Sequence, residues 1–451
     1  MNSNLKEFIK YTVFNVLGMI GLSCYILADT FFISFGLGAN GLAALNLALP
    51  VYSVINGSGL MLGIGGATKY AIMKNQGNKK YNESFMNTVF MAIVIGIIFF
   101  LTGIIFSGNI ATLLGANKQV YHMTSIYLKV LLMFGPAFVL NNVMNAFVRN
   151  DGNPKLSMIA MLVGSFGNII LDYLLVIKFS MGMFGAVLAT GFSPIMGLMV
   201  LSGHIVSENS SIKFKVAKIR ASFIKSIIML GIPSFVAEMS SGIVIFVFNI
   251  IILGLQGNVG VAAYGVIANL ALVVISIYTG VAQGSQPLFS AAYGKNDKKM
   301  QKQLFKYAIT AVTLISIVIY AVILLFANPI TSIFNGEGNM QLQAIAVKGM
   351  YLYFTSILFI GMNIVMATYF AAREKVIPSY IISFGRGFVV IIPMAFIMSF
   401  LWKMTGVWLA MTVTEEIIAA GYIEVDSQNR SRTLGEYGII NAQTYYNRCC
   451  R

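Results

Sequence analysis

Charged residues are scarce in this 451-residue sequence. They make up 10% of the chain, compared with about 25% in a soluble domain. Cysteine, tryptophan and proline are also few, at 3, 2 and 9 copies. Three cysteines, of which Cys24 lies in an apolar run, do not provide the disulfide framework of a small secreted protein. With 58% hydrophobic residues and a mean hydropathy of +0.81, this composition excludes a soluble enzyme and a disordered chain.

Long apolar runs fill most of the sequence, and short polar stretches containing turn residues separate them. A helix needs about 20 apolar residues to cross a bilayer. In lipid, every backbone polar group must be satisfied within its own segment, so these runs are predicted to be helices. We predict an all-α membrane protein with about twelve transmembrane helices. The runs lie near residues 13–36, 42–68, 85–107, 123–147, 157–178, 183–206, 223–253, 260–291, 305–327, 343–370, 378–402 and 405–420.

Basic residues are concentrated at alternate ends of the apolar runs. Twenty Lys and Arg residues lie at the ends that include the N-terminus, and the opposite ends carry only five, at Lys118, Lys129, Lys178, Lys348 and Lys403. This bias places the N-terminus in the cytoplasm of a multi-pass protein of the cell membrane. The net charge of +15 therefore reflects membrane topology and does not indicate a nucleic-acid partner.

The two halves of the chain resemble each other. The stretch 41–44 (Gly-Leu-Ala-Ala) matches 260–263 (Gly-Val-Ala-Ala) at an offset of 219, which also superposes Gly65 on Gly284. Six runs per half, an even number, indicate a parallel repeat of two lobes around a central cavity. The predicted organisation is an N-terminal lobe at 1–206, a cytoplasmic linker at 207–222, a C-terminal lobe at 223–420 and a polar tail at 421–451.

Three acidic residues lie deep inside apolar runs: Asp29, Asp172 and Glu238. An ionised carboxylate at the bilayer centre costs at least about 2.5–3.5 kcal/mol, so each should face a cavity or a partner. Asn168 lies one helical turn before Asp172, and Thr190 lies in the following run. Together with Asp29, these oxygen-bearing groups suit a cation or a proton. The alternative is that Asn168 and Asp172 only form hydrogen bonds between helices and that Thr190 bonds the backbone of its own helix.

The sequence resembles the multidrug and toxic-compound extrusion (MATE) family, in particular its bacterial drug exporters. The resemblance is carried by 28–32 (Ala-Asp-Thr-Phe-Phe), 41–44, 167–172 (Gly-Asn-Ile-Ile-Leu-Asp) and 231–234 (Gly-Ile-Pro-Ser). It implies two pseudo-symmetric six-helix lobes that alternate between inward-facing and outward-facing states. It also implies export of cationic, amphipathic compounds by a monomer that exchanges them for sodium ions or protons and needs no other cofactor.

The resemblance also assigns roles to residues. It implies a cation-coupling or proton-coupling site formed by Asp29, Asn168, Asp172 and Thr190, which could also hold sodium, and a substrate-binding role for Tyr127. Glu238 matches an acidic position found in part of the family, where it would meet a cationic substrate. The alternative for Glu238 is a hydrogen bond between helices.

Other functions fit the sequence less well. A flippase for lipids or lipid-linked sugars would have a large cationic cavity and commonly fourteen spans, whereas Arg386 is the only basic residue deep in a run. Nothing resembles the signalling domain of a receptor, and an ATP-driven pump would need a phosphate-binding loop.

Three further expectations concern residues near the ends of runs. We expect Arg386 to reach toward the cytoplasmic surface, and His122 and His204 to lie at the membrane interface. Because polar residues follow Gly421, we expect the last helix to be short or frayed beyond Ala420.

Overall fold

The computed structural model describes residues 3–214, 218–335 and 338–449, with side chains described as far as Gly421. Within these ranges the chain is almost entirely helical and contains no strand. η1 and η3 are π-helical and η2 is a 3₁₀ turn. The elements are α1 (Ser3–Asn75), α2 (Tyr81–Leu113), α3 (Tyr121–Met133), α4 (Gly135–Asn150), α5 (Pro154–Asp172), η1 (Tyr173–Lys178), α6 (Gly182–Val206), α7 (Ala221–Gly294), α8 (Lys298–Phe334), α9 (Met340–Tyr353), η2 (Phe354–Ser356), α10 (Ile357–Ala371), α11 (Val376–Phe384), η3 (Gly385–Val389) and α12 (Ile391–Cys449).

Three of the long helices contain a break. α1 breaks at Gly38 (φ 65°, ψ −157°) and α7 breaks at Gly257 (φ 62°, ψ −157°), a backbone conformation that glycine adopts without strain. α12 breaks at Trp402 and Lys403. In the described residues, eight continuous stretches are long and apolar enough to cross a membrane, and the bent pair α3–α4 makes nine. Divided at the breaks, with α11 and η3 leading into α12, these helices form six spans in each half, as predicted.

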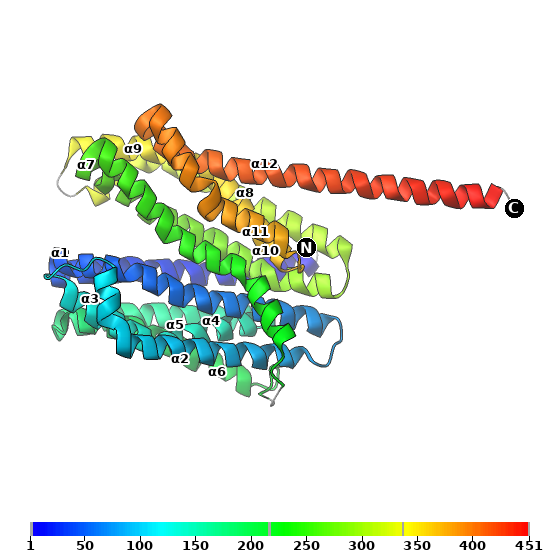
Figure 1. Cartoon of the computed structure of the whole chain (residues 1–451), viewed down its shortest axis with the longest axis horizontal. Helices are drawn as coiled ribbons and strands as arrows, with labels where there is room; N and C mark the ends of the chain where they lie inside the picture. Colours follow the sequence, from blue (N-terminus) through cyan, green and yellow to red (C-terminus); the bar gives the residue numbers. More distant parts are fainter. Residues whose placement is uncertain (1–2, 215–217, 336–337, 450–451) are drawn as a thin grey trace.

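The two halves form two lobes with separate hydrophobic cores. Figure 1 shows the lobes converging toward the end that holds the N-terminus and the segment after α6, which we call the linker end. The opposite end, which holds Gly38, Gly257 and Lys403, is called the break end. At the linker end, the first helix of each half packs against the core of the other lobe. Phe8 and Tyr11 of α1 belong to the second-lobe core, and Ile227 of α7 belongs to the first-lobe core.

The turn between α4 and α5 follows directly from its sequence. Asn153 caps α5 by accepting a hydrogen bond from the Leu156 N–H at 3.1 Å, and Pro154 occupies the first helical turn, where its missing N–H costs nothing. Gly152 has a φ of +102°. This turn places Asp151 at the linker end of the first lobe.

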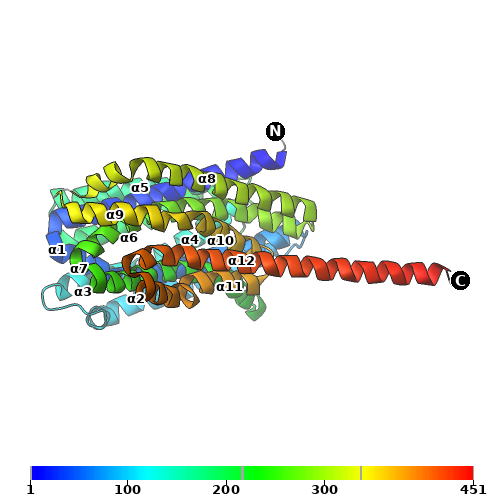
Figure 2. The same ribbon diagram turned by 90° about the horizontal axis from the view of Figure 1, so that it is seen from above.

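The expectation of a short or frayed last helix is wrong. α12 continues as one helix to Cys449 and projects far beyond the two lobes (Figures 1 and 2). The part of α12 that is apolar enough to cross a membrane nevertheless ends at Gly421, where the sequence predicts the end of the apolar run. Apolar composition therefore marked the end of the span, but not the end of the helix, because a helix satisfies its own backbone in water as well as in lipid.

Candidate functional site

The first lobe brings Asp29, Asn168, Asp172 and Thr190 together. Asp29 lies in the part of α1 before Gly38, Asn168 and Asp172 end α5, and Thr190 lies in α6. All four are buried, with at most 7% of any residue exposed. The carboxyl groups of Asp29 and Asp172 lie within hydrogen-bonding reach of each other. The site is therefore built from three helices near the break end.

Asn168 joins α5 to α6 at this site. In the amide orientation that satisfies both of its neighbours, its Nδ2 donates to Asp172 Oδ2 at 3.1 Å, and its Oδ1 accepts from the Thr190 N–H at 3.2 Å. The Thr190 hydroxyl donates to the Ala186 carbonyl at 3.1 Å. Tyr127 of α3 is only 3% exposed and lies near the Thr190 side chain and the Asp29 carboxyl group. Tyr127, which the resemblance assigned to substrate, thus lies beside the acidic pair.

The two carboxyl groups each keep one oxygen unsatisfied. Among the described residues, Asp29 Oδ1 and Asp172 Oδ1 are buried and have no hydrogen-bond donor. Two ionised carboxylates are both acceptors and cannot satisfy each other, whereas a shared proton or a bound cation would satisfy both. In the described part of the chain, no group of three or more His, Cys, Asp and Glu side chains could hold a metal ion. Any cation here would therefore depend on two carboxylates and neutral oxygens.

Glu238 lies between the lobes. It belongs to the part of α7 before Gly257, and its Oε1 accepts a hydrogen bond from Asn56 Nδ2 of α1 at 2.9 Å. The Asn56 Oδ1 in turn accepts from Asn142 Nδ2 of α4, also at 2.9 Å. Because Gly57 has no side chain, α1 approaches Glu238 closely. The only described partner of the Glu238 carboxylate is a neutral amide from the other lobe, so its charge is not neutralised by the protein there.

The sequence analysis missed a buried ion pair in the second lobe. Arg386 of η3 donates from Nε and Nη2 to Glu415 Oε1 of α12, at 3.1 and 2.9 Å. Asn363 of α10 donates to Glu415 Oε2 at 2.7 Å. The Glu415 side chain is fully buried and that of Arg386 is 13% exposed. The expectation that Arg386 reaches toward the surface is wrong, since a carboxylate on the next helix in sequence neutralises it inside the lobe.

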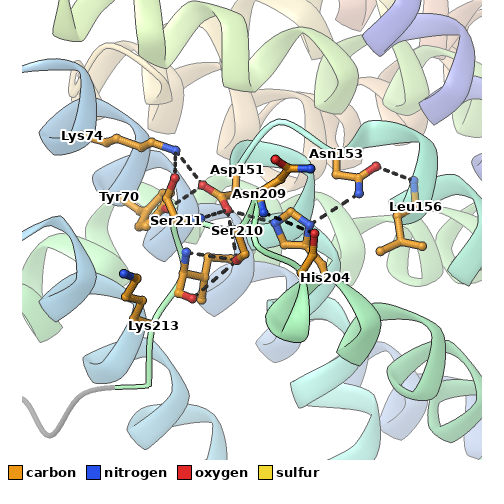
Figure 3. A network of polar contacts seen from close by, with 12 residues as sticks. Tyr70, Lys74, Asp151, Asn153, Leu156, His204, Asn209, Ser210, Ser211 and Lys213 are labelled. Carbon is orange, nitrogen blue, oxygen red and sulfur yellow. Dashed lines mark hydrogen bonds and ion pairs between the residues drawn. The ribbon is translucent and has the colours of Figure 1, made fainter.

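A second missed cluster surrounds Asp151 at the linker end (Figure 3). The carboxylate accepts hydrogen bonds from Tyr70, Lys74 and His204 at 2.6–2.9 Å, and from the Ser211 N–H at 2.8 Å. Burial alone would raise the pKa of Asp151, but the hydrogen bonds from His204, Lys74 and Tyr70 outweigh it and hold the pKa below its ordinary value. The contact with Ser211 ties the start of the linker to the first lobe.

His204 lies in the last turn of α6 and is buried by its partners at the linker end. Its side chain is 3% exposed, and its Nε2 lies 2.9 Å from Asp151 Oδ2. Asn153 Nδ2 lies 3.5 Å from the other ring nitrogen. In sequence, only the proximity of Asp151 and His204 to run ends hinted at this pair, and proximity to a run end does not identify a partner.

Two lobes of six helices, with carboxyl groups buried inside both lobes and between them, are typical of a helical membrane transporter. The sequence model of the MatE family matches residues 16–174 and 233–419, which is most of the chain. The chain therefore belongs to the multidrug and toxic-compound extrusion family.

Characterised relatives and solved structures agree with this membership. The chain is 27% identical to the multidrug export protein MepA of Staphylococcus saprophyticus, over 93% of this chain and 92% of that protein. It is 28% identical to MepA of Staphylococcus aureus strain MRSA252, over 92% and 91% of the two chains. A MOP superfamily transporter from Pyrococcus furiosus, described as having a binding pocket of reverse polarity, shares the fold with a TM-score of 0.87 and 23% identity, over 93% and 94% of the chains. A MATE protein in complex with MaL6 matches with a TM-score of 0.88 and 22% identity, over 95% and 98%.

Proposed function

We propose that this protein is a secondary antiporter of the cell membrane that exports cationic, amphipathic drugs or toxic compounds in exchange for protons. Membership of the MATE family and similarity to two multidrug export proteins support a transporter rather than an enzyme. The excess of basic residues at the linker end supports a cytoplasmic location for that end and for the N-terminus. The transported compound would move from the linker end to the break end.

The observation that carries the proposal is the acidic pair Asp29–Asp172. Its carboxyl groups lie within reach of each other with one unsatisfied oxygen each, which is the arrangement in which two acids retain a proton. The Asn168 amide oxygen accepts one hydrogen bond and the Thr190 hydroxyl donates one, so each oxygen keeps a lone pair that a sodium ion could use. We propose the proton as the coupling ion because a proton by itself satisfies two close buried acids, and the sodium gradient in the test below decides the alternative.

Glu238 is the group proposed to meet a cationic substrate. It carries an acidic side chain into the space between the lobes and is held there by a neutral amide that a cation can displace. Coupling then requires only that protonation of the first-lobe pair and occupation of the Glu238 region favour different conformations. The chain would work as a monomer, since both groups belong to one chain.

The test is efflux of ethidium from vesicles under separate proton and sodium gradients. A proton gradient should stimulate efflux by the unmodified protein, and Asp29→Asn or Asp172→Asn should abolish that stimulation. Glu416→Gln provides the matched control, because Glu416 is an exposed acid in α12. Stimulation by sodium alone would replace the proton with sodium in the proposal, and full proton-driven export by both aspartate variants would refute the coupling site.

The second candidate function is a flippase for lipids or lipid-linked sugars. It is less well supported, because Arg386, the basic residue deep in the second lobe, is neutralised by Glu415 and so offers no free positive charge there to a pyrophosphate. Absence of ethidium efflux under either gradient, together with movement of a labelled lipid, would favour this alternative.

A further inference from the structure

Backbone contacts hold the lobes together at the linker end. The part of α1 after Gly38 meets the start of α7, and Gly65 lies directly against the Ile227 carbonyl. In the other half, Gly284 of α7 lies against the start of α1, where an added Cβ would meet the Tyr11 carbonyl at 2.8 Å. Real Cβ atoms essentially never come this close to another heavy atom. Each contact therefore requires a residue without a side chain.

A second pair of contacts lies one step deeper. Gly231 of α7 packs directly on the Met61 carbonyl of α1. Gly280 of α7 packs on Val16 of α1, where an added Cβ would lie 2.7 Å from the Val16 Cα. In both cases the first helix of one half meets the second helix of the other half, and at least one partner is glycine.

The four contacts are related by the internal repeat. The offset of 219 that superposes Gly65 on Gly284 also superposes Met61 on Gly280. The residues that these positions contact are related by nearly the same offset: Ile227, which contacts Gly65, lies 216 positions after Tyr11, which contacts Gly284. Likewise Gly231, which contacts Met61, lies 215 positions after Val16, which contacts Gly280. The same contact thus occurs twice around the pseudo-two-fold axis. We call these four contacts the glycine seam.

Polar side chains surround the glycine seam, and one of them, Arg149, is a buried cation whose described partners carry no negative charge. Arg149 of α4 is 2% exposed and donates to Asn15 Oδ1 at 3.0 Å and, across the lobes, to Gln283 Oε1 at 3.3 Å. Asn150 donates to Gln286 Oε1 at 2.9 Å. These partners are neutral amides, so water can replace each hydrogen bond at little net cost when the lobes separate.

One ion pair crosses the lobes beside the seam. Lys69 of α1 lies 2.6 Å from Glu374, with about a quarter and a third of the two side chains exposed. A pair this exposed contributes little stability. Close glycine packing therefore determines how near the lobes come, and exchangeable polar contacts surround it.

We propose that the glycine seam is the gate that seals the linker end of the transporter, and that its closure depends on the absence of side chains at Gly65, Gly231, Gly280 and Gly284. This inference rests on the proposed alternation between two open states. A methyl group at any of these positions holds the lobes apart and shifts the protein toward the state that is open at the linker end. Because the contacts come in symmetric pairs, substitution in either half shifts the protein in the same direction.

The experiment measures lobe separation at the break end. The spin labels are attached at Lys118→Cys and Lys348→Cys, two exposed sites at the break end that belong to different lobes. Pulsed electron paramagnetic resonance measures the distance between the two labels. The native cysteines Cys24, Cys449 and Cys450 are replaced with serine in every variant. Gly65→Ala and Gly231→Ala are the test variants. Gly242→Ala and Gly265→Ala are the controls, because an added Cβ at these two positions of α7 meets nothing within 4 Å.

Gly65→Ala and Gly231→Ala should move the distance distribution to shorter values and lower ethidium efflux at least tenfold, with ethidium binding retained. The controls should match the unmodified protein. Gly284→Ala has the mildest overlap and serves as the variant that folds if the others do not; it should give a smaller shift in the same direction. An unchanged distribution in folded Gly65→Ala or Gly284→Ala would overturn the gate.

The distance measurement needs no transport, which separates the two proposals. If the unmodified protein fails to export ethidium, the proposed function is contradicted. The distances between the spin labels in the alanine variants still test whether the glycine seam is the gate.

Discussion

Replacing Arg386 with methionine should destabilise the protein strongly, because its partner Glu415 is completely buried. Removing one member of a buried ion pair costs about 3–5 kcal/mol, since the remaining charge has neither water nor a counter-ion. In Arg386→Met, the Glu415 carboxylate keeps only the hydrogen bond from Asn363. Uptake of a proton by Glu415 would limit the loss, so we expect the lower half of that range.

The double variant Arg386→Met/Glu415→Gln separates the ion pair from the packing of Arg386. A neutral replacement of a buried pair is tolerated, so this variant should lie within about 1–2 kcal/mol of the parent protein. Unfolding can be followed by tryptophan fluorescence in a detergent-to-SDS titration, because Trp408 of the same helix is 1% exposed. The reasoning is refuted if Arg386→Met unfolds at the same SDS fraction as the parent, or if the double variant is no more stable than the single one.

Two further predictions concern Asp151 and Glu238. Because contacts with His204 and Lys74 help to hold the pKa of Asp151 below its ordinary value, its contribution to stability is complete above about pH 4 and is lost as the pH falls toward the folded-state pKa. Asp151→Asn should therefore lower stability at pH 7 by on the order of 1.5–3 kcal/mol and weaken the loss on acidification. Thermal unfolding at pH 7 and at about pH 2 measures both effects, and an Asp151→Asn variant that loses as much stability between these two pH values as the parent protein does would contradict the assignment. Glu238→Gln keeps an acceptor for Asn56 but removes the charge, so it should weaken ethidium binding about tenfold and leave a neutral ligand unaffected. Fluorescence titration with both ligands is the check, and equal losses for the two would indicate a structural role.

The spans and their breaks could be predicted from the sequence because they depend on local properties. Apolar runs of sufficient length must be helices in lipid, and the glycine-rich stretch around Gly38 interrupts the first run at the residue whose φ is positive. The break at Gly257 lies in the interval that separates the predicted runs near 223–253 and 260–291. The clustering of Asp29 with Asp172 followed from the scarcity of acids in the apolar runs and from the family resemblance.

The contacts of Arg386, His204 and Asp151 could not be predicted, because each depends on which helices meet at a given depth. Spacing along one helix placed Arg386 several residues from a run end and suggested the surface, but it did not indicate that Glu415 of α12 lies at the same depth. Asp151 looked like an ordinary turn acid, since its partners come from α1, α6 and the linker. The glycine seam was visible in part as a repeat match, but its close contacts emerge only when the lobes are assembled.

The neutral pairing of Arg386 with Glu415 has an electrical consequence. A charge that crosses the whole membrane potential changes the energy by about 2.3 kcal/mol per 100 mV. Two opposite charges held about 3 Å apart move together and contribute almost nothing to that work. The pair therefore gives the second lobe a polar interior without making its motion sensitive to voltage. Any voltage dependence of the conformational cycle is then left to the buried charges without a described counter-ion, which are Arg149, Asp29, Asp172 and Glu238, and to whatever cation the acids carry.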